Sequence, residues 1–147
     1  MFHALSRDVV FHAPAPMTPD DLDVMARTLW GEARGEALEG KIAVAWVIRN
    51  RADHPGWWGH GIAEVCRAPW QFSAWNADDP NRAKLIGVTA RDDMFRDCLM
   101  VAAGVLSNNF PDPTGGANHY HAKGVSPNWV AGAAPVLRLR NHAFYKL

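Results

Sequence analysis

The sequence predicts an α+β fold with a mainly helical core and a small antiparallel sheet. Apolar residues recur at helical spacing through the first part of the chain, up to about residue 106. One segment, 42–48, is wholly apolar, which is typical of a buried helix. The remainder carries short apolar pieces and an alternating run at 136–140, separated by glycine and proline, and this pattern favours short strands.

Length and composition indicate one domain with a real core. The chain has 147 residues, 48% of them apolar, which suits a single domain. Acidic and basic residues balance at 15 each, and a nucleic-acid-binding protein would usually carry a basic excess. No run approaches the roughly 20 apolar residues that span a bilayer, so we expect no membrane insertion. Residues 1–16 are predicted to form an N-terminal arm, and residues 17–147 the folded domain.

The first helix has a marked beginning. Thr18 is the candidate N-cap, Pro19 suits the first helical position, and Asp21 completes a capping box. One apolar stripe at i, i+3, i+4, i+7 and i+8 follows: Leu22, Met25, Ala26, Leu29 and Trp30. We expect Gly35 to break this helix.

Two further helices and a long loop are predicted beyond it. The helices cover about 38–51 and 92–106, with a short helical turn at 62–67. Residues 69–91 show little periodicity and many turn-forming residues. A long irregular stretch in a compact domain is often a binding loop.

Cysteines and tryptophans give two further expectations. Cys66 and Cys98 lie in apolar, helical contexts and are expected to be buried thiols, although a disulfide between them stays open. The chain has seven tryptophans, and some fall in stretches rich in Gly, Pro and Asn. There they are expected to line a groove, where a flat ring suits a sugar ring.

Glu32 is the candidate catalytic carboxyl. It follows the apolar stripe at the end of the first helix, and partial burial would raise its pKa as a general acid requires. The alternative is a solvated glutamate at a helix end. Glu36 and Glu39 are expected in the first turn of the second helix, where negative charge is stabilising.

His119, His121 and His142 raise a second possibility. Two histidines one residue apart, with a third further on, are compatible with a zinc site. No Asp or Cys accompanies them in the pattern, so we expect no metal ligand and no cofactor.

Four blocks of the sequence form a specific series. The longest covers 26–36 (ARTLWGEARGE), continues at 39–45 and ends with the Arg-Asn-Arg at 49–51. Three shorter blocks follow at 71–73, at 112–117 with Tyr120 and His121 just after, and at 141–145. In content and order these blocks resemble the SleB/CwlJ-type cell wall hydrolases, which include the spore cortex-lytic enzymes. The resemblance extends over roughly residues 22 to 147.

The resemblance implies a lysozyme-like fold and cleavage of the bond between N-acetylmuramic acid (MurNAc) and N-acetylglucosamine (GlcNAc) in peptidoglycan. It implies that Glu32 is the catalytic glutamate. It also implies that the chain acts as a lytic transglycosylase, whose product carries 1,6-anhydroMurNAc ends. Plain muramidase hydrolysis is the alternative outcome. A zinc-dependent amidase or peptidase and a non-catalytic wall-binding module are the competing classes.

Supporting contacts with the substrate are expected from residues in and near the matching blocks. They are Gln71, Ser73, Trp75, Thr114, Gly115, Gly116, Tyr120, His121 and Trp129. For each of them the alternative is a role in a turn or in the core.

The expected partner is the glycan strand of bacterial peptidoglycan, bound by a monomer. We see no secretory signal at the N-terminus. A phage-type endolysin, made in the cytoplasm and released to the wall through a holin-type membrane lesion, would fit this. Export by a non-standard route is the alternative.

Overall fold

The computed structural model describes residues 18–69 and 71–147, so the predicted arm at 1–16 lies outside the described residues. The longer helices are α2 (Pro19–Ala33), α3 (Leu38–Asp53) and α6 (Asp93–Leu106), and the short ones are α4 (Ile62–Arg67) and α5 (Asn81–Gly87). The 3₁₀ turn η1 (Ser73–Trp75) lies between α4 and α5. The strands are β1 (His119–Ala122), β2 (Leu137–Arg138) and β3 (His142–Tyr145), and the 3₁₀ turn η2 (Asn128–Val130) lies between β1 and β2. The expected class, helical with a small antiparallel sheet, is confirmed.

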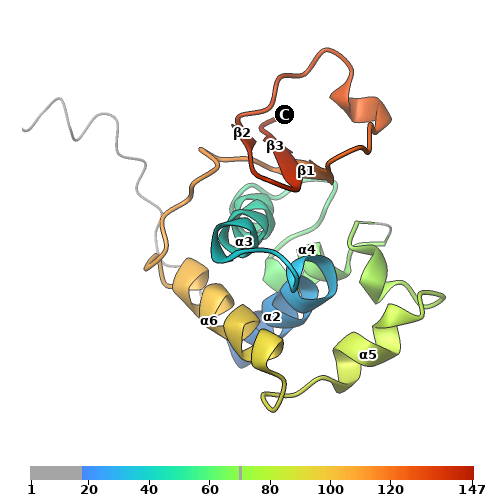
Figure 1. Cartoon of the computed structure of the whole chain (residues 1–147), viewed down its shortest axis with the longest axis vertical. Helices are drawn as coiled ribbons and strands as arrows, with labels where there is room; N and C mark the ends of the chain where they lie inside the picture. The colour runs from blue at the N-terminus through green and yellow to red at the C-terminus, as the bar shows by residue number, and fades with distance from the viewer. Residues whose placement is uncertain (1–17, 70) are drawn as a thin grey trace, which may run out of the picture.

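The helices α2, α3 and α6 pack against one another and form the core (Figure 1). The segment 42–48 lies inside α3, and all of it except Ile42 is buried. The side chains of Trp46 and Ile48 are almost fully enclosed. This confirms the inference that a helix without a polar face is buried by its neighbours.

Capping residues begin two of these helices, and the predicted cap at Thr18 is confirmed. The Thr18 hydroxyl accepts from the backbone N–H of Asp21 at 3.1 Å, and the Asp21 carboxylate accepts from the N–H of Thr18 at 3.4 Å. Asp92 caps α6 by accepting from the N–H of Phe95 at 2.9 Å. Each cap gives a free helical N–H a partner.

The prediction for residues 69–91 is wrong in part, because this stretch contains η1 and α5. Within the short helix α5 only Leu85 is buried, so the sequence has no repeated apolar stripe to reveal a helix. The contact of Leu85 with the core, and not periodicity, fixes α5 against α2.

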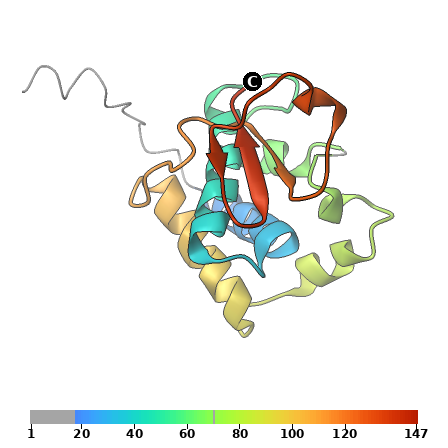
Figure 2. The same cartoon turned by 45° about the horizontal axis from the view of Figure 1, so that its top comes forward.

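The three strands form one antiparallel sheet in the order β1-β3-β2. His119 pairs with Tyr145, Tyr120 with Phe144, and His121 with Ala143. Side chains alternate between the two faces of a strand, so Tyr120 and Phe144 lie on one face and His121 on the other. The sheet lies across one end of the helical part, beside α3 (Figures 1 and 2).

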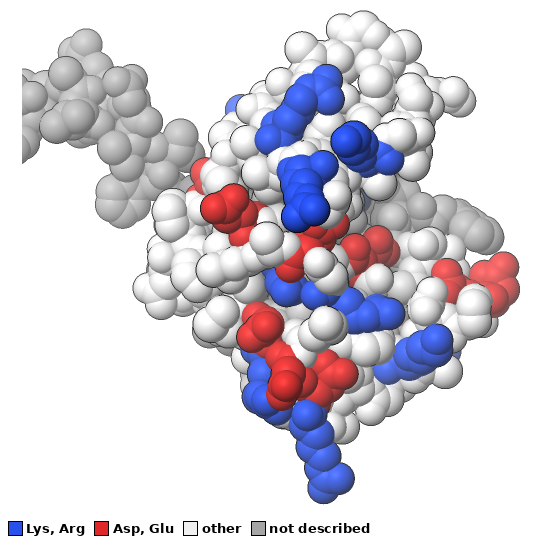
Figure 3. All heavy atoms as spheres, in the orientation of Figure 1, with Lys and Arg blue, Asp and Glu red and all other residues white. Residues whose placement is uncertain are grey.

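The two cysteines are buried and unbridged, so the expectation of buried thiols is confirmed. Burial raises the pKa of Cys66 to about 12 and that of Cys98 to about 11. Among the described residues, no helix has the length and apolar character needed to cross a membrane. Basic and acidic side chains are interspersed on the face of the molecule shown in Figure 3.

Candidate active site

Glu32 lies in the last turn of α2, and its side chain is partly buried. Its neighbour Trp30 turns into the core, with the guanidinium of Arg34 stacked 4.2 Å from the ring centre. Glu32 is therefore neither extended into bulk solvent nor enclosed in the core, which is the environment that a general acid needs.

The surroundings of Glu32 raise its pKa from 4.5 to about 7. Desolvation by burial is the main cause, and the negative charge of Asp79 adds to it. A hydrogen bond with the backbone of Ala74 acts in the opposite direction and is the smaller influence on this pKa. A carboxyl of this kind holds its proton near neutral pH and can donate it.

A close helix contact brings Ala74 to Glu32. Gly31 precedes Glu32 in α2, and a Cβ atom at Gly31 would lie 3.1 Å from the Cβ of Ala74. Because Gly31 has no side chain, η1 can approach α2 closely at this turn. The backbone of Ala74 then reaches the carboxyl group.

Tyr120 lies within range of the charge of Glu32, and Arg51 lies within range of Tyr120. Burial, and after it the charge of Glu32, raises the pKa of Tyr120 well above its usual 10, so its hydroxyl stays protonated and can donate. Burial lowers the pKa of Arg51, whose guanidinium lies 5.7 Å from the centre of the Phe72 ring. Arg51 was not among the predicted site residues.

The late block of the sequence forms a turn that fixes β1 against α3. The Asp112 carboxylate accepts hydrogen bonds from the N–H and hydroxyl of Thr114 at 2.8 and 2.6 Å and from the N–H of Gly116 at 3.0 Å. It also accepts from Asn50 Nδ2 of α3 at 3.0 Å. Next to this turn, Arg51 Nε donates to the carbonyl of Asn118 at 2.7 Å. These bonds position Tyr120, two residues later, within range of the charge of Glu32.

The main structural role of Thr114, Gly115 and Gly116 is to form this turn. Thr114 is only 2% exposed, and its hydroxyl accepts from the N–H of Ala117 at 3.0 Å. The two glycines adopt φ values of +64° and +97°, which residues with side chains rarely adopt. The structure therefore shows a scaffolding function for all three, and their predicted contact with substrate stays a prediction.

Known proteins resemble this chain in sequence and in fold. A model of the cell wall hydrolase family matches residues 35–145. The chain belongs to the cell wall hydrolase family. The spore cortex-lytic enzyme of Halalkalibacterium halodurans is 31% identical over 134 residues, which are 90% of this chain and 37% of that protein. The spore cortex-lytic enzyme of Bacillus subtilis is 28% identical over 137 residues, which are 92% of this chain and 41% of that protein.

Two solved structures of SleB catalytic domains resemble this chain in fold. The catalytic domain of the germination-specific lytic transglycosylase SleB from Bacillus anthracis superimposes with a TM-score of 0.68 at 26% identity, covering 91% of this chain and 100% of that one. The catalytic domain of the Bacillus cereus SleB protein gives 0.68 at 25% identity, covering 94% and 100%. The lysozyme-like α+β fold is thereby confirmed. This cell wall hydrolase spans less than half the length of the curated relatives described above.

The family match begins at residue 35, just after Glu32. The role of Glu32 in this cell wall hydrolase consequently rests on its position and surroundings in the structure and not on that match.

The prediction for Glu36 is wrong, whereas that for Glu39 is confirmed. Glu39 lies in the first turn of α3. Glu36 lies in the connection before α3, and its carboxylate accepts from Asn141 Nδ2 at 2.7 Å and approaches His142 Nδ1 at 3.3 Å. It therefore joins the turn after α2 to the start of β3. No local pattern in the sequence announces a contact between residues 105 positions apart.

The three histidines of the zinc hypothesis do not share one face of the sheet. His119 and His121 lie on the face of Trp129, with ring centres 5.0 and 5.8 Å from the indole. His142 lies on the other face, 5.3 Å from the Tyr120 ring. Within residues 18–69 and 71–147, no group of three or more His, Cys, Asp or Glu side chains is close enough to hold a metal ion.

The predicted substrate contacts fall into two groups around the sheet. Tyr120 lies on the face of the sheet that carries Phe144 and within range of the charge of Glu32. His121 and Trp129 lie on the opposite face, where His121 Nε2 is 2.9 Å from the Tyr145 hydroxyl. Gln71 is half-buried and Ser73 exposed, and they lie three residues and one residue before Ala74. Trp75 is half-buried, and its indole N–H donates to the Thr28 hydroxyl at 2.9 Å.

Two further tryptophans form an open hollow that the site prediction missed. Trp57 is 68% exposed and packs edge-on against Trp58 with ring centres 5.2 Å apart. Both border a hollow of about 400 Å³ that Arg67 and Pro69 also line. An exposed, rigid aromatic pair of this kind suits contact with the apolar face of a sugar. The run of Pro, Gly and Trp at 55–59 was the available signal.

Proposed function

We propose that this chain cleaves the MurNAc–GlcNAc bond of peptidoglycan as a lytic transglycosylase, with Glu32 as acid and then as base. The observation that carries the proposal is the position of the Glu32 carboxyl, at the end of α2 and only partly accessible, where burial raises its pKa to about 7. The names of the relatives, spore cortex-lytic enzymes and the lytic transglycosylase SleB, support the substrate and the reaction.

In the first step Glu32 donates its proton to the glycosidic oxygen. The bond between C1 of the MurNAc ring and that oxygen breaks, the GlcNAc alcohol leaves, and positive charge develops at C1. Glu32 becomes a carboxylate, which stabilises this charge together with the oxygen of the substrate's own acetamido group. Tyr120 lies within range of the charge of Glu32, and its protonated hydroxyl is the hydrogen-bond donor that we assign to the developing charge.

In the second step the carboxylate of Glu32 acts as base. It takes the proton of the C6 hydroxyl of the same MurNAc, and O6 attacks C1. The product is a 1,6-anhydro ring, Glu32 is protonated again, and no water is consumed. Hydrolysis would differ only in the nucleophile, because water would then attack C1 and leave a reducing end.

The test is mass spectrometry of purified peptidoglycan after digestion by the wild type and by Glu32→Gln. We expect the wild type to yield anhydro-muropeptides and the variant, which keeps the size of the side chain but cannot transfer the proton, to be slower by at least about 100-fold. The wild-type rate should also fall above about pH 7, where Glu32 loses its proton. Glu32→Gln with normal activity would refute the assignment.

The same digest separates the alternatives. Reducing-end sugars would indicate plain hydrolysis, and freed peptides would indicate an amidase. Activity that a chelator abolishes and zinc restores would favour the zinc-dependent class. Binding of the wall without any product would indicate a non-catalytic module.

We further propose the phage-type endolysin setting, in which the enzyme reaches the wall through a membrane lesion, and action as a monomer. Both are predictions from the sequence. Sizing of the purified chain and lysis assays with and without a permeabilised membrane would test them.

A further inference from the structure

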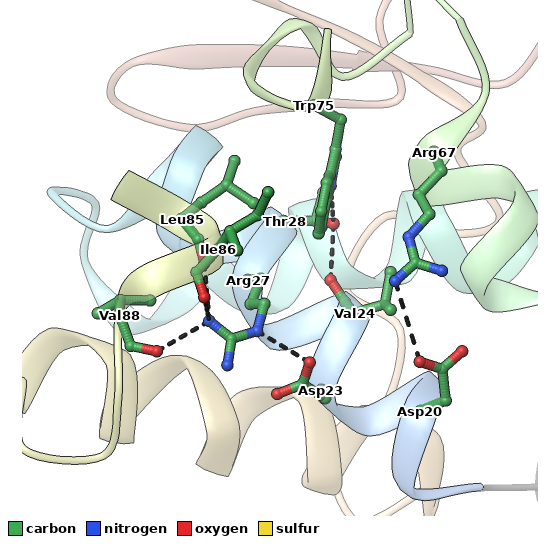
Figure 4. Close-up of polar contacts among 10 residues, drawn as sticks. All are labelled: Asp20, Asp23, Val24, Arg27, Thr28, Arg67, Trp75, Leu85, Ile86 and Val88. Atoms are coloured by element: carbon green, nitrogen blue, oxygen red, sulfur yellow. Dashed lines mark hydrogen bonds and ion pairs between the residues drawn. The ribbon is translucent and has the colours of Figure 1, made fainter. Parts of the chain in front are cut away.

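A second hollow lies on the flank of α2, near the candidate acid. Its volume is about 510 Å³, and Asp23, Arg27, Arg67, Trp75, Arg82 and Ile86 line it. Figure 4 shows Trp75 and Arg67 on one side of this region, with Arg27 and Ile86 across from them. The hollow is within the size range of sites that bind small organic ligands and is far larger than a single ion.

The charges lining the hollow are mainly positive. Three arginines face one aspartate. Arg27 is fixed in place, because its Nε donates to Asp23 at 2.8 Å and its Nη1 donates to the carbonyls of Leu85 and Val88 at 2.7 and 2.8 Å. Asp23 is therefore already paired, so the remaining charge in the hollow is positive.

The other two arginines are available to a ligand. The Arg82 side chain makes no hydrogen bond or ion pair with the described residues. Arg67 has only a loose pair with Asp20 at 3.9 Å, and the two side chains are 50% and 65% exposed. Its guanidinium lies 5.3 Å from the centre of the Trp75 ring, which orients it. Arginine binds carboxylates through two parallel N–H donors.

The hollow is close to the reacting centre. Trp75 follows Ala74, whose backbone bonds to Glu32, and its indole is held by Thr28, one helical turn before Glu32. Four residues advance a helix by about 6 Å. A branch that leaves the sugar bound at Glu32 would therefore reach the hollow within a few bonds.

We propose that this hollow binds the carboxylate-bearing stem peptide of the muramic acid at the cleaved bond, with Arg82 and Arg67 as its carboxylate ligands. This deepens the proposed function and rests on it. MurNAc is the sugar that carries the peptide branch, and it is also the sugar whose C1 reacts. A peptide with several carboxylates matches both the volume and the charge of the hollow, whereas an uncharged sugar ring would leave the two arginines without partners.

The test compares soluble peptidoglycan strands that carry stem peptides with the same strands stripped of them by an amidase. On peptide-bearing strands we expect Arg82→Gln to raise KM about tenfold, the effect of one lost charge-assisted hydrogen bond, with kcat little changed. On stripped strands the variant and the wild type should have equal KM values. Lys84→Gln is the matched control, because Lys84 lies in the same helix, is exposed and does not line the hollow.

The outcomes separate this inference from the proposed function. Failure of the wild type to cleave either substrate would overturn the proposed function. Normal cleavage by the wild type, with Arg82→Gln equal to it on both substrates or impaired equally on both, would overturn only the stem-peptide site.

Direct binding gives a second readout. In the full chain carrying Glu32→Gln, free stem peptide should shift the indole N–H resonance of Trp75, and the same peptide with all carboxylates amidated should not. No shift with the free peptide, or an equal shift with both, would contradict the proposal. Thermal unfolding of Arg82→Gln checks that the variant is folded, which we expect because Arg82 is exposed and its side chain makes no hydrogen bond or ion pair with the described residues.

Discussion

A single carboxyl, Glu32, links stability to chemistry in this protein. Its pKa is 4.5 in a solvated chain and about 7 in the fold, so between these values the native state binds more protons than the unfolded state. Stability then falls as pH rises through this window. Each pKa unit corresponds to about 1.4 kcal/mol, so the ionised Glu32 should destabilise the fold by about 3 kcal/mol above pH 7.

Glu32→Gln should therefore be more stable than the wild type at high pH while it is inactive. We expect a gain of up to about 3 kcal/mol at pH 8 and no gain at pH 4, where the wild-type side chain is also neutral. Urea unfolding of both proteins at the two pH values measures this difference. An equal stability difference at both pH values would mean that the Glu32 carboxyl is solvated and not poised as an acid.

At the scale of the elements, the contact between α2 and η1 determines where the backbone of Ala74 lies. Gly31→Ala would place a methyl group 3.1 Å from the Cβ of Ala74, so η1 must shift by a few tenths of an ångström. Alanine is favoured over glycine in a helix by about 1 kcal/mol, which offsets the strain of the contact. The change should consequently affect the site more than the stability.

We expect Gly31→Ala to lower kcat about tenfold while the free energy of unfolding changes by less than about 1 kcal/mol. Gly35→Ala is the control, because a Cβ at Gly35 meets nothing within 4 Å. Steady-state kinetics and urea unfolding of both variants make the comparison. Equal kinetics for the two variants would show that the approach of η1 to α2 does not position the catalytic group.

The helices differ in how far their own residues predict them. The capping box at Thr18 and the apolar stripe of α2 are local patterns, and both predicted that helix correctly. Helix α5 is held mainly by Leu85, so its own residues show no period. The contact of Glu36 with β3 depends on the tertiary fold, and a glutamate before a helix looks like an ordinary first-turn residue.

At the scale of the whole molecule, the site is assembled by polar residues at the end of the buried helix α3. Asn50 bonds to Asp112 and to the carbonyl of Ala117, both at 3.0 Å, and Arg51 bonds to Asn118. These contacts join the sheet to the helical core and hold Tyr120 within range of the charge of Glu32. The sequence predicted Glu32 and Tyr120 separately, but their proximity and the role of Arg51 follow only from the assembled fold.

The two thiols report whether this assembly opens as one unit. Cys66 is in α4 and Cys98 in α6, and both helices pack on α2. Both thiols are buried, and burial raises their pKa values to about 12 and about 11, so neither has the accessible thiolate that reacts with alkylating reagents. A reagent should reach either thiol only when its helix leaves the core.

We therefore expect no alkylation of Cys66 or Cys98 by iodoacetamide at pH 8 in the native protein, and alkylation of both in urea. The labelling midpoints of the two thiols should coincide with the midpoint from tryptophan fluorescence, as two-state unfolding requires. Peptide mass spectrometry distinguishes the two sites. Earlier labelling of Cys66 would show that α4 opens locally before the core. Because α4 carries Arg67, which lies beside Trp75, the proposed stem-peptide site would then belong to a mobile part of the molecule and not to its rigid core.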